Sequence, residues 1–200
     1  MAQSLLIIVS APSGTGKSTL CRELLKRNPS LKYSISCTTR PPRKSEEEGR
    51  DYFFTTPDEF QRRVDRGDFL EWAKVHGCLY GTPKRFTEET LRRGWNVLLA
   101  IDVQGALSIR EKQRDAVLIF VVPPSWESLE SRLRNRDGDS RTAEQRLAAA
   151  RNELQHFKSY DYLLVNDRLE ETVEQMESII LSESLRVHRR EDRVQVLVNQ

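Results

Sequence analysis

The sequence predicts an α/β fold in which helices flank a parallel β-sheet. Short apolar runs rich in β-branched residues, such as 5–9 and 117–122, are typical of strands that are covered on both faces. Segments with helical periodicity separate these runs, and such alternation favours a parallel sheet. The stretch 35–90 breaks the alternation with several short strand candidates, which indicates a separate lobe.

The elements follow in order along the chain. Strands are expected at 5–9, 33–37, 52–54, 69–75, 78–80, 97–101, 117–122 and 162–165. Helices are expected at 18–27, 57–66, 83–93, 104–113 and 125–136, in a second long segment after the polar break 137–140, and at 169–180. Thr56 with Pro57 and Glu59 is typical of a helix N-terminus, and Thr142 with Gln145 predicts another. The tail 191–200 is predicted either to form an interface strand or to cover the core.

Composition excludes several classes of protein. Hydrophobic residues make up 38% of the 200 residues and charged residues 31%, as in globular proteins rather than disordered ones. The longest apolar runs fall well short of the roughly 20 residues that span a bilayer, and the N-terminus lacks a secretory signal pattern. The net charge of +2 gives no general reason to expect a nucleic-acid partner. Three cysteines without metal-ligand spacing favour free thiols, so we expect a cytoplasmic protein with no membrane partner.

The segment 11–18, between a strand and a helix, is the strongest local motif. It reads Ala11, Pro12, Ser13, Gly14, Thr15, Gly16, Lys17 and Ser18, and it predicts a P-loop. The glycines let backbone N–H groups surround phosphate oxygens, Lys17 reaches the β- and γ-phosphates, and the Ser18 hydroxyl binds Mg²⁺. The usual pattern begins with glycine, and here Ala11 takes that place. A P-loop predicts a nucleoside triphosphate as a ligand without naming the acceptor.

A longer set of motifs resembles the guanylate kinase family over nearly the whole chain. The motifs are 36–43 (SCTTRPPR), 49–54 (GRDYFF), 69–73 (FLEWA), 80–82 (YGT), 101–105 (IDVQG), the arginine-rich segment 132–146 and 165–167 (VND). The resemblance implies a P-loop NTPase core that transfers the γ-phosphoryl group of ATP to GMP, with Mg²⁺ as cofactor and dGMP as a second expected acceptor.

The resemblance also implies roles for single residues. Glu71 would accept the N1–H and amino donors of guanine, and Ser36 would donate to O6. Arg40, Arg43, Tyr52 and Tyr80 would hold the phosphate of GMP, with Thr82 and Asp102 also at the substrate. Asn166 would lie near the adenine of ATP. Arg132, Arg136 and Arg146 match arginines of a lid over ATP. The implied catalytic residues are Lys17, Arg40, Arg136 and Arg146, and the implied metal ligands are Ser18 and Asp102.

The expected organisation has four parts. The P-loop core comprises 1–34, 94–124 and 158–190, the GMP-binding lobe 35–93, the lid 125–157 and the tail 191–200. The sequence departs from the family at Ala100, where an acidic residue is usual, and the lid is slightly short. A scaffold without turnover, a P-loop kinase for another phosphorylated acceptor and a nucleic-acid-binding role stay open as alternatives, and the oligomeric state is undetermined.

Overall fold

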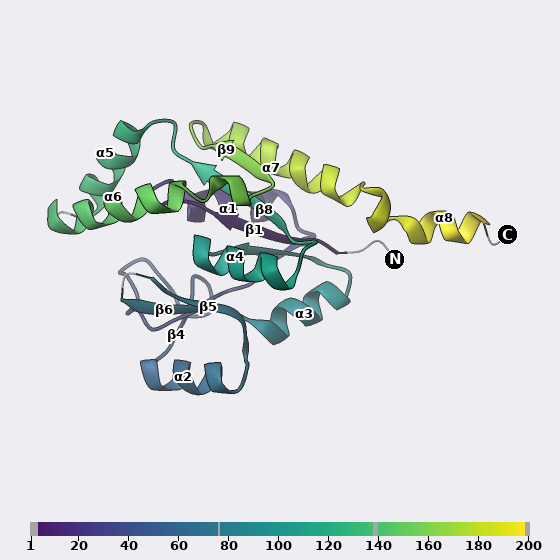
Figure 1. The fold of residues 1–200 in the computed structure, drawn as a ribbon, viewed down its shortest axis with the longest axis horizontal. Coiled ribbons are helices and arrows are strands. Elements are labelled where there is room, and N and C mark those ends of the chain that lie inside the picture. Colours follow the sequence, from purple (N-terminus) through teal and green to yellow (C-terminus); the bar gives the residue numbers. More distant parts are fainter. Residues whose placement is uncertain (1–3, 76, 138–139, 199–200) are drawn as a thin grey trace.

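The computed structural model describes residues 4–75, 77–137 and 140–198. Its central sheet has the strand order β2-β7-β1-β8-β9, seen near the middle of Figure 1. The strands are β1 (Leu6–Ser10), β2 (Leu31–Tyr33), β7 (Asn96–Ala100), β8 (Val117–Val122) and β9 (Tyr162–Val165). All four pairings are parallel, which confirms the predicted parallel sheet.

Helices cover both faces of this sheet. The helices are α1 (Lys17–Arg27) and α7 (Leu169–Ser184) on one face, and α3 (Lys84–Arg92) and α4 (Val103–Lys112) towards the other. Successive residues of β1 point to opposite faces, so Ile7 packs in the cluster that includes residues of α1 and α7. Ile8 packs in the cluster that includes Ala106 and Ile109 of α4. The expected helix at 169–180 is confirmed, with Val173 and Met176 fully buried.

A second, mixed sheet forms the lower part of the molecule in Figure 1. Its strand order is β4-β3-β6-β5, from β3 (Cys37–Thr38), β4 (Phe53–Phe54), β5 (Phe69–Val75) and β6 (Cys78–Pro83). Helix α2 (Pro57–Asp65) begins where the sequence predicts, because Oγ1 of Thr56 accepts a hydrogen bond from the Glu59 backbone N–H. Phe60 of α2 stacks on Phe69 of β5 with 4.6 Å between ring centroids, which fixes the helix to the sheet.

Helices α5 (Trp126–Asp137) and α6 (Ser140–Leu154) leave the central sheet together and lie above it in Figure 1. They pack through a small apolar cluster that includes Leu129, Leu133 and Ala150. A short 3₁₀ helix, η1 (Phe157–Ser159), leads back to β9. The C-terminal end consists of η2 (Val187–Arg189) and α8 (Glu191–Val198).

Two sequence predictions were wrong in detail, and a third was left open. The expected strand 33–37 is two strands, because the Ser34 N–H bonds to Leu98 O and the chain then crosses from the central sheet to the mixed sheet. Thr142 lies inside α6 rather than at its N-cap, since the helix already begins at Ser140 and the polar break is shorter than predicted. The tail, for which the sequence left an interface strand or a cover over the core open, forms the helix α8, which satisfies its backbone hydrogen bonds without a sheet edge.

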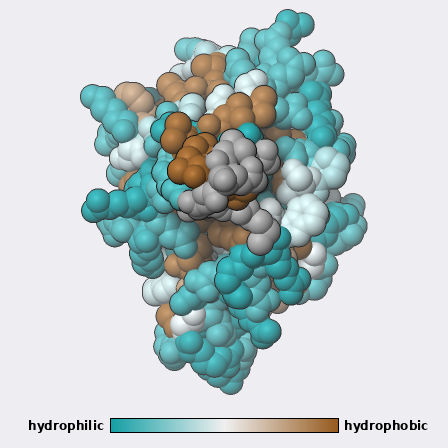
Figure 2. Space-filling view, turned by 90° about the vertical axis from the view of Figure 1, so that its right-hand side faces the viewer, coloured by the Kyte–Doolittle hydropathy of each residue, from teal (hydrophilic) through white to brown (hydrophobic). Residues whose placement is uncertain are grey.

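The C-terminal end of the molecule exposes apolar side chains. Brown hydrophobic atoms gather there in Figure 2, and α7, η2 and α8 contribute exposed Leu181, Leu185, Val187, Val194, Val196 and Val198. Among the described helices, none is long and apolar enough to cross a membrane. The described cysteines, Cys21, Cys37 and Cys78, are free thiols.

Candidate functional site

The loop 11–18 connects the carboxyl end of β1 to the N-terminus of α1, as the sequence predicts. Gly14 and Gly16 have φ values of 89° and 98°, a left-handed backbone conformation that L side chains rarely adopt. A Cβ on Gly16 would also stand 2.7 Å from Nδ2 of Asn166. Both glycines are therefore required by conformation, and Gly16 by space as well.

Residues from distant parts of the chain converge on this loop. Nδ2 of Asn166, just after β9, donates to the Thr15 carbonyl at 2.7 Å, and Nη1 of Arg132 in α5 donates to the same oxygen at 3.3 Å. A Cβ on Gly14 would approach Leu133 to 3.0 Å, so α5 packs directly on the loop. Of the three predicted ATP-binding residues outside the loop, Asn166 and Arg132 therefore lie against it, and the side chain of Arg136 is outside the described part of the structure.

Lys17 points from the loop towards the end of strand β7. Its Nζ donates to the carbonyl of Ile101 at 2.6 Å. Burial lowers the pKa of Lys17, while negative charges nearby, including those of Asp102 and Glu153, favour its protonated form. Asp102 forms the N-cap of α4, and its Oδ1 accepts hydrogen bonds from the backbone N–H groups of Gln104 and Gly105. The predicted phosphate ligand and the predicted metal ligand therefore meet at the same edge of the sheet.

Three polar residues form a row across the mixed sheet. Glu71 of β5 pairs with Thr82 of β6. Because Cys37 pairs with Gly81 in the antiparallel β3–β6 ladder, the same register sets Ser36 opposite Thr82. All three residues are buried, with Glu71 only 4% exposed. The predicted guanine-binding pair, Ser36 and Glu71, is therefore carried on one sheet with Thr82 between them.

The Glu71 carboxyl group is buried. Thr82 Oγ1 donates to its Oε1 at 2.5 Å. Burial raises the pKa of Glu71 to about 7, and the negative charge of Asp102 adds to this rise, while the hydrogen bond from Thr82 opposes it. The backbone of Gly105 in α4 packs against its other oxygen. A carboxyl group held in this way has its orientation fixed before any ligand binds.

The predicted phosphate-binding residues of the acceptor also cluster. Nε of Arg40 donates to the Tyr80 hydroxyl at 3.2 Å, and the Arg40 guanidinium lies 5.4 Å from the ring centre of Tyr52. The rings of Tyr52 and Tyr80 are 5.9 Å apart in an edge-on arrangement. Arg43 joins the group through Glu46, which accepts from its backbone N–H at 2.8 Å. Two guanidinium groups and two phenols thus face one small region.

Comparisons with known proteins agree with this geometry. Residues 3–183 match the model of the guanylate kinase family. The chain belongs to the guanylate kinase family. It is 46% identical to a guanylate kinase from Thermotoga maritima, over 95% of this chain and 92% of the relative, and 45% identical to one from Geobacter sulfurreducens, over 94% and 93%. The crystal structure of guanylate kinase from Anaplasma phagocytophilum superposes with a TM-score of 0.81, at 34% identity, and covers 94% of this chain and 90% of that one.

Two residues that the sequence analysis missed lie beside the predicted site residues. Glu46 receives both Arg40 Nη2 hydrogen bonds, at 2.8 and 2.9 Å, and so holds that guanidinium in place. Glu153 reaches the P-loop from α6. Burial raises its pKa to about 7, while Lys17 and the backbone N–H of Ser13 lower it. Its Oε2 is buried and has no hydrogen-bond partner in the described part of the chain.

Sequence signals for these two glutamates are weak. Glu46 lies in an acidic run that resembles a solvated loop, and Glu153 lies in a helix rich in charged residues. Charge alone does not separate a site residue from a solvated one. Of the predicted lid arginines, Arg132 contacts the P-loop and Arg146 is half-buried on α6. The side chain of Arg136 lies outside the described part of the structure.

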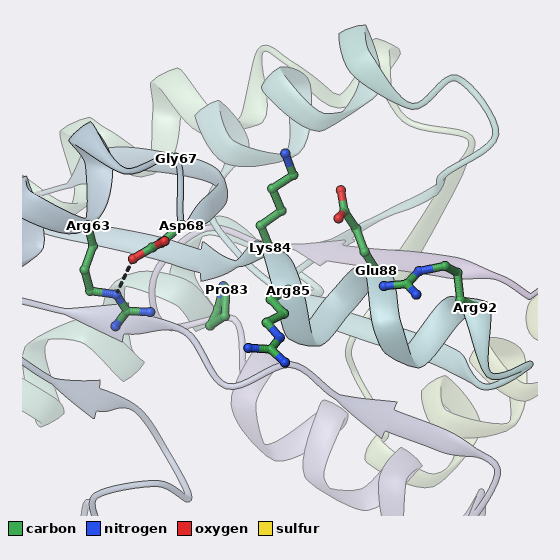
Figure 3. A pocket seen from close by; sticks show the side chains of 8 residues that line it. All are labelled: Arg63, Gly67, Asp68, Pro83, Lys84, Arg85, Glu88 and Arg92. Atoms are coloured by element: carbon green, nitrogen blue, oxygen red, sulfur yellow. Dashed lines mark ion pairs between the residues drawn. The ribbon is translucent and has the colours of Figure 1, made fainter.

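A surface pocket on the mixed sheet lies apart from these residues. It measures about 380 Å³ and lies between the end of α2 and the start of α3 (Figure 3). Arg63, Asp68, Lys84, Arg85 and Glu88 contribute to its lining. Arg63 pairs with Asp68 at 3.9 Å and Arg85 with Glu89 at 2.8 Å. This pocket contains none of the predicted site residues.

Proposed function

We propose that this chain transfers the γ-phosphoryl group of ATP to GMP, giving ADP and GDP, through the residues described above. The family assignment supports this reaction. The observation that carries the assignment of the acceptor is the buried row of Ser36, Thr82 and Glu71. A carboxylate accepts the two adjacent donors of guanine, N1–H and the amino group, whereas adenine would place an N1 lone pair against it.

Before GMP binds, the Glu71 carboxyl group already has the orientation and the raised pKa that favour hydrogen bonds from guanine. Its pKa is raised because the buried charge lacks sufficient partners, and hydrogen bonds from guanine to the charged form would lower it again. Ser36, in the same row, would donate its hydroxyl proton to O6 of guanine. A buried polar site that loses its partner discriminates between ligands by roughly 10⁴-fold or more. Base selection would therefore come from burial as much as from the carboxylate itself.

The phosphate of GMP would bind to the cluster of Arg40, Arg43, Tyr52 and Tyr80. Guanidinium groups bind phosphate oxygens through paired hydrogen bonds. A phosphate monoester has a second pKa near about 6 and is largely a dianion at neutral pH. Its oxygen is already a nucleophile, so the transfer needs no general base. The work of the site is to position two polyanions and neutralise their charge.

The donor side would be formed by the P-loop 11–18. Backbone N–H groups of the loop and Lys17 would hold the phosphates of ATP. Asn166 and Arg132, which lie on the loop at the Thr15 carbonyl, would contact the nucleotide. Arg136 and Arg146 would complete the charge neutralisation as the segment 125–157 closes over ATP. Closure excludes water and limits hydrolysis of ATP.

Mg²⁺ is the expected cofactor, and the residues present fit it. Ser18 follows Lys17 in the chain and supplies a hydroxyl, and the carboxylate of Asp102 is near enough to Lys17 to favour its protonated form. Among the described residues no group of three or more acidic, histidine or cysteine side chains forms a metal cage. This matches Mg²⁺, which is usually held by one or two protein carboxylates together with substrate phosphates and water. The ion would neutralise charge on the phosphates, while Ser18 and Asp102 orient it.

The free thiols of the cysteines support a location in a reducing compartment, the cytoplasm. All three cysteines are free, as is usual where thiols stay reduced.

The reaction itself is tested by a coupled assay of ADP release with ATP and Mg²⁺, comparing GMP, AMP, UMP and CMP as acceptors. Turnover with GMP and little with the others is the expected result. Binding of ATP without turnover on GMP would overturn the proposal and indicate a scaffold or another acceptor.

A further inference from the structure

Arg189 of η2 is a buried cation without a described acidic partner. The residue is 4% exposed, and its Nη2 donates to the backbone carbonyl of Asp115 at 2.7 Å. Its Nε is buried and has no hydrogen-bond partner among the described residues. A buried charge is costly unless it is paired, so this guanidinium is incompletely satisfied.

Arg189 lines a hollow of about 480 Å³ at the edge of the central sheet opposite the P-loop. Leu6, at the start of β1, and Ala116, just before β8, lie at its base, whereas the P-loop follows the other end of β1. The lining residues are Ser4, Leu6, Leu91, Arg92, Lys112, Gln113, Arg114, Asp115, Ala116 and Arg189. Four cationic side chains therefore face one carboxylate.

Helix ends explain part of this charge. Arg92 and Lys112 lie in the last turns of α3 and α4, where cations offset the negative end of the helix dipole. Lys112 also donates to the carbonyl of Leu70 at 3.3 Å. Arg189 differs from both in its burial: it also donates to a backbone carbonyl, but it lies in the three-residue 3₁₀ helix η2 and its side chain is buried. The buried guanidinium therefore needs a separate explanation.

The pocket of Figure 3 provides a contrast within the same molecule. It too is rich in arginine, but Arg63 and Arg85 form ion pairs with Asp68 and Glu89. These two guanidinium groups are therefore paired within the protein itself. In the hollow around Arg189, by contrast, the buried guanidinium has a backbone carbonyl as its described partner. An anion from solution would supply the missing charge.

We infer that the hollow around Arg189 is a second binding site, for a small phosphate-bearing anion. Guanidinium groups form paired hydrogen bonds with phosphate oxygens, and the exposed Arg114 lies at the same hollow. Its volume falls within the range of roughly 300–1,000 Å³ of small-molecule sites. Leu6, Leu91 and Ala116 add apolar wall, which suits the organic part of a phosphate ester better than a bare ion.

The test observes Arg189 directly, so it does not depend on the proposed catalytic activity. The arginine Nε–H signals of the ¹⁵N-labelled full chain are recorded by NMR, and the signal lost in Arg189→Lys is assigned to Arg189. Inorganic pyrophosphate is then titrated with GMP and ADP present to fill the nucleotide sites. The expected result is a saturable shift of the Arg189 signal at millimolar pyrophosphate or below.

Two exposed variants show whether the effect is local. Arg114→Ala removes one cation of the hollow and should weaken the pyrophosphate affinity by about 3- to 5-fold, as for an exposed ion pair. Arg85→Ala removes one cation of the other pocket and should leave that affinity unchanged. An Arg189 signal that does not move would overturn the inference. It would indicate that a bound water, rather than an anion, accepts the hydrogen bond of the Arg189 Nε–H. Equal weakening by both variants would also overturn it, since it would show attraction by overall charge only.

Discussion

Oε2 of Glu71 lies 2.5 Å from the point at which a Cβ on Gly105 would stand. Glycine therefore allows the first turn of α4 to pack directly on the carboxyl group that we assign to guanine recognition. The same turn is fixed at its N-cap by Asp102, whose Oδ1 accepts from the Gly105 backbone N–H at 3.2 Å. The acceptor base site and the end of strand β7 are thus joined through a single helical turn.

Replacing Gly105 with alanine should impair GMP binding more than folding. The added methyl group would push the Glu71 carboxyl group out of its row, and a displacement of about 1 Å costs roughly 10²-fold in catalytic efficiency. Alanine would gain about 1 kcal/mol of helix propensity, which offsets part of the 1–3 kcal/mol typical of overpacking. We expect kcat/KM for GMP to fall by about 10²-fold with a small change in Tm.

The matched control is Gln104→Ala, an exposed neighbour on the same turn. It should leave both kcat/KM and Tm close to those of the parent chain. Steady-state kinetics with varied GMP and thermal unfolding of the three proteins measure the two effects separately. If Gly105→Ala kept full activity on GMP, the close packing of Gly105 on Glu71 would have no role in positioning the carboxylate.

The affinity for GMP should depend on pH through Glu71. With a pKa of about 7 the free carboxyl group holds its proton below neutrality and must lose it to accept the two donors of guanine. KM for GMP should therefore rise as pH falls below about 7, by up to about tenfold per unit. The same raised pKa favours the folded state below the usual value of 4.5, and this contribution is lost as pH rises through 7.

Glu71→Gln supplies the control for this pH profile. The phosphate of GMP itself gains a proton near pH of about 6, and that step affects the parent chain and the variant alike. In Glu71→Gln the part of the profile near neutrality should disappear while the phosphate part stays. A parent chain whose KM profile from about pH 8 to 6 matches that of Glu71→Gln would show that Glu71 is ionised throughout.

Removing the charge of Glu153 should tighten nucleotide binding at alkaline pH. The Glu153 carboxyl group faces Lys17 and the backbone N–H of Ser13, both of which we assign to phosphate binding. Its pKa of about 7 means that it is charged above neutrality and then competes with phosphate. For Glu153→Gln we expect the Kd of ADP to fall by about 3-fold or more near pH 8, and by little near pH 6.

Calorimetry of ADP binding at the two pH values measures this effect without turnover. Glu144→Gln, an exposed change on the same helix, is the control and should behave like the parent chain at both. Weaker ADP binding by Glu153→Gln at both pH values would contradict competition. It would show instead that the carboxylate supports the loop in its binding conformation.

Much of the fold follows from local patterns in the sequence. The buried apolar runs identify β1, β7 and β8 to within a residue or two, because a strand covered on both faces must be apolar throughout. Thr56 and Pro57 identify the start of α2 for a similarly local reason. The two sheets at 31–38 were not separated, since the crossing at Ser34 depends on hydrogen bonds to Leu98 and Thr87 far along the chain.

The residues of the candidate site also fall into two groups, those that the sequence predicts and those that only the folded structure reveals. Residues that belong to contiguous motifs, such as Gly14, Gly16 and Lys17, were predicted because their backbone conformation is local. Glu46 and Glu153 were not, because their importance arises from partners that only the folded chain brings near them. The tail 191–200 was ambiguous because alternating valines fit either a strand or a short helix, and tertiary context decides between them.

The central claim is that Glu71 selects guanine, and the ratio of kcat/KM for GMP to that for AMP tests it most directly. The parent chain should favour GMP by roughly 10⁴-fold or more. In Glu71→Gln the amide can donate to N1 of adenine, so the ratio should fall by about 10²-fold or more while turnover of ATP persists. A ratio that stays unchanged in Glu71→Gln would contradict the account and place base selection elsewhere in the mixed sheet.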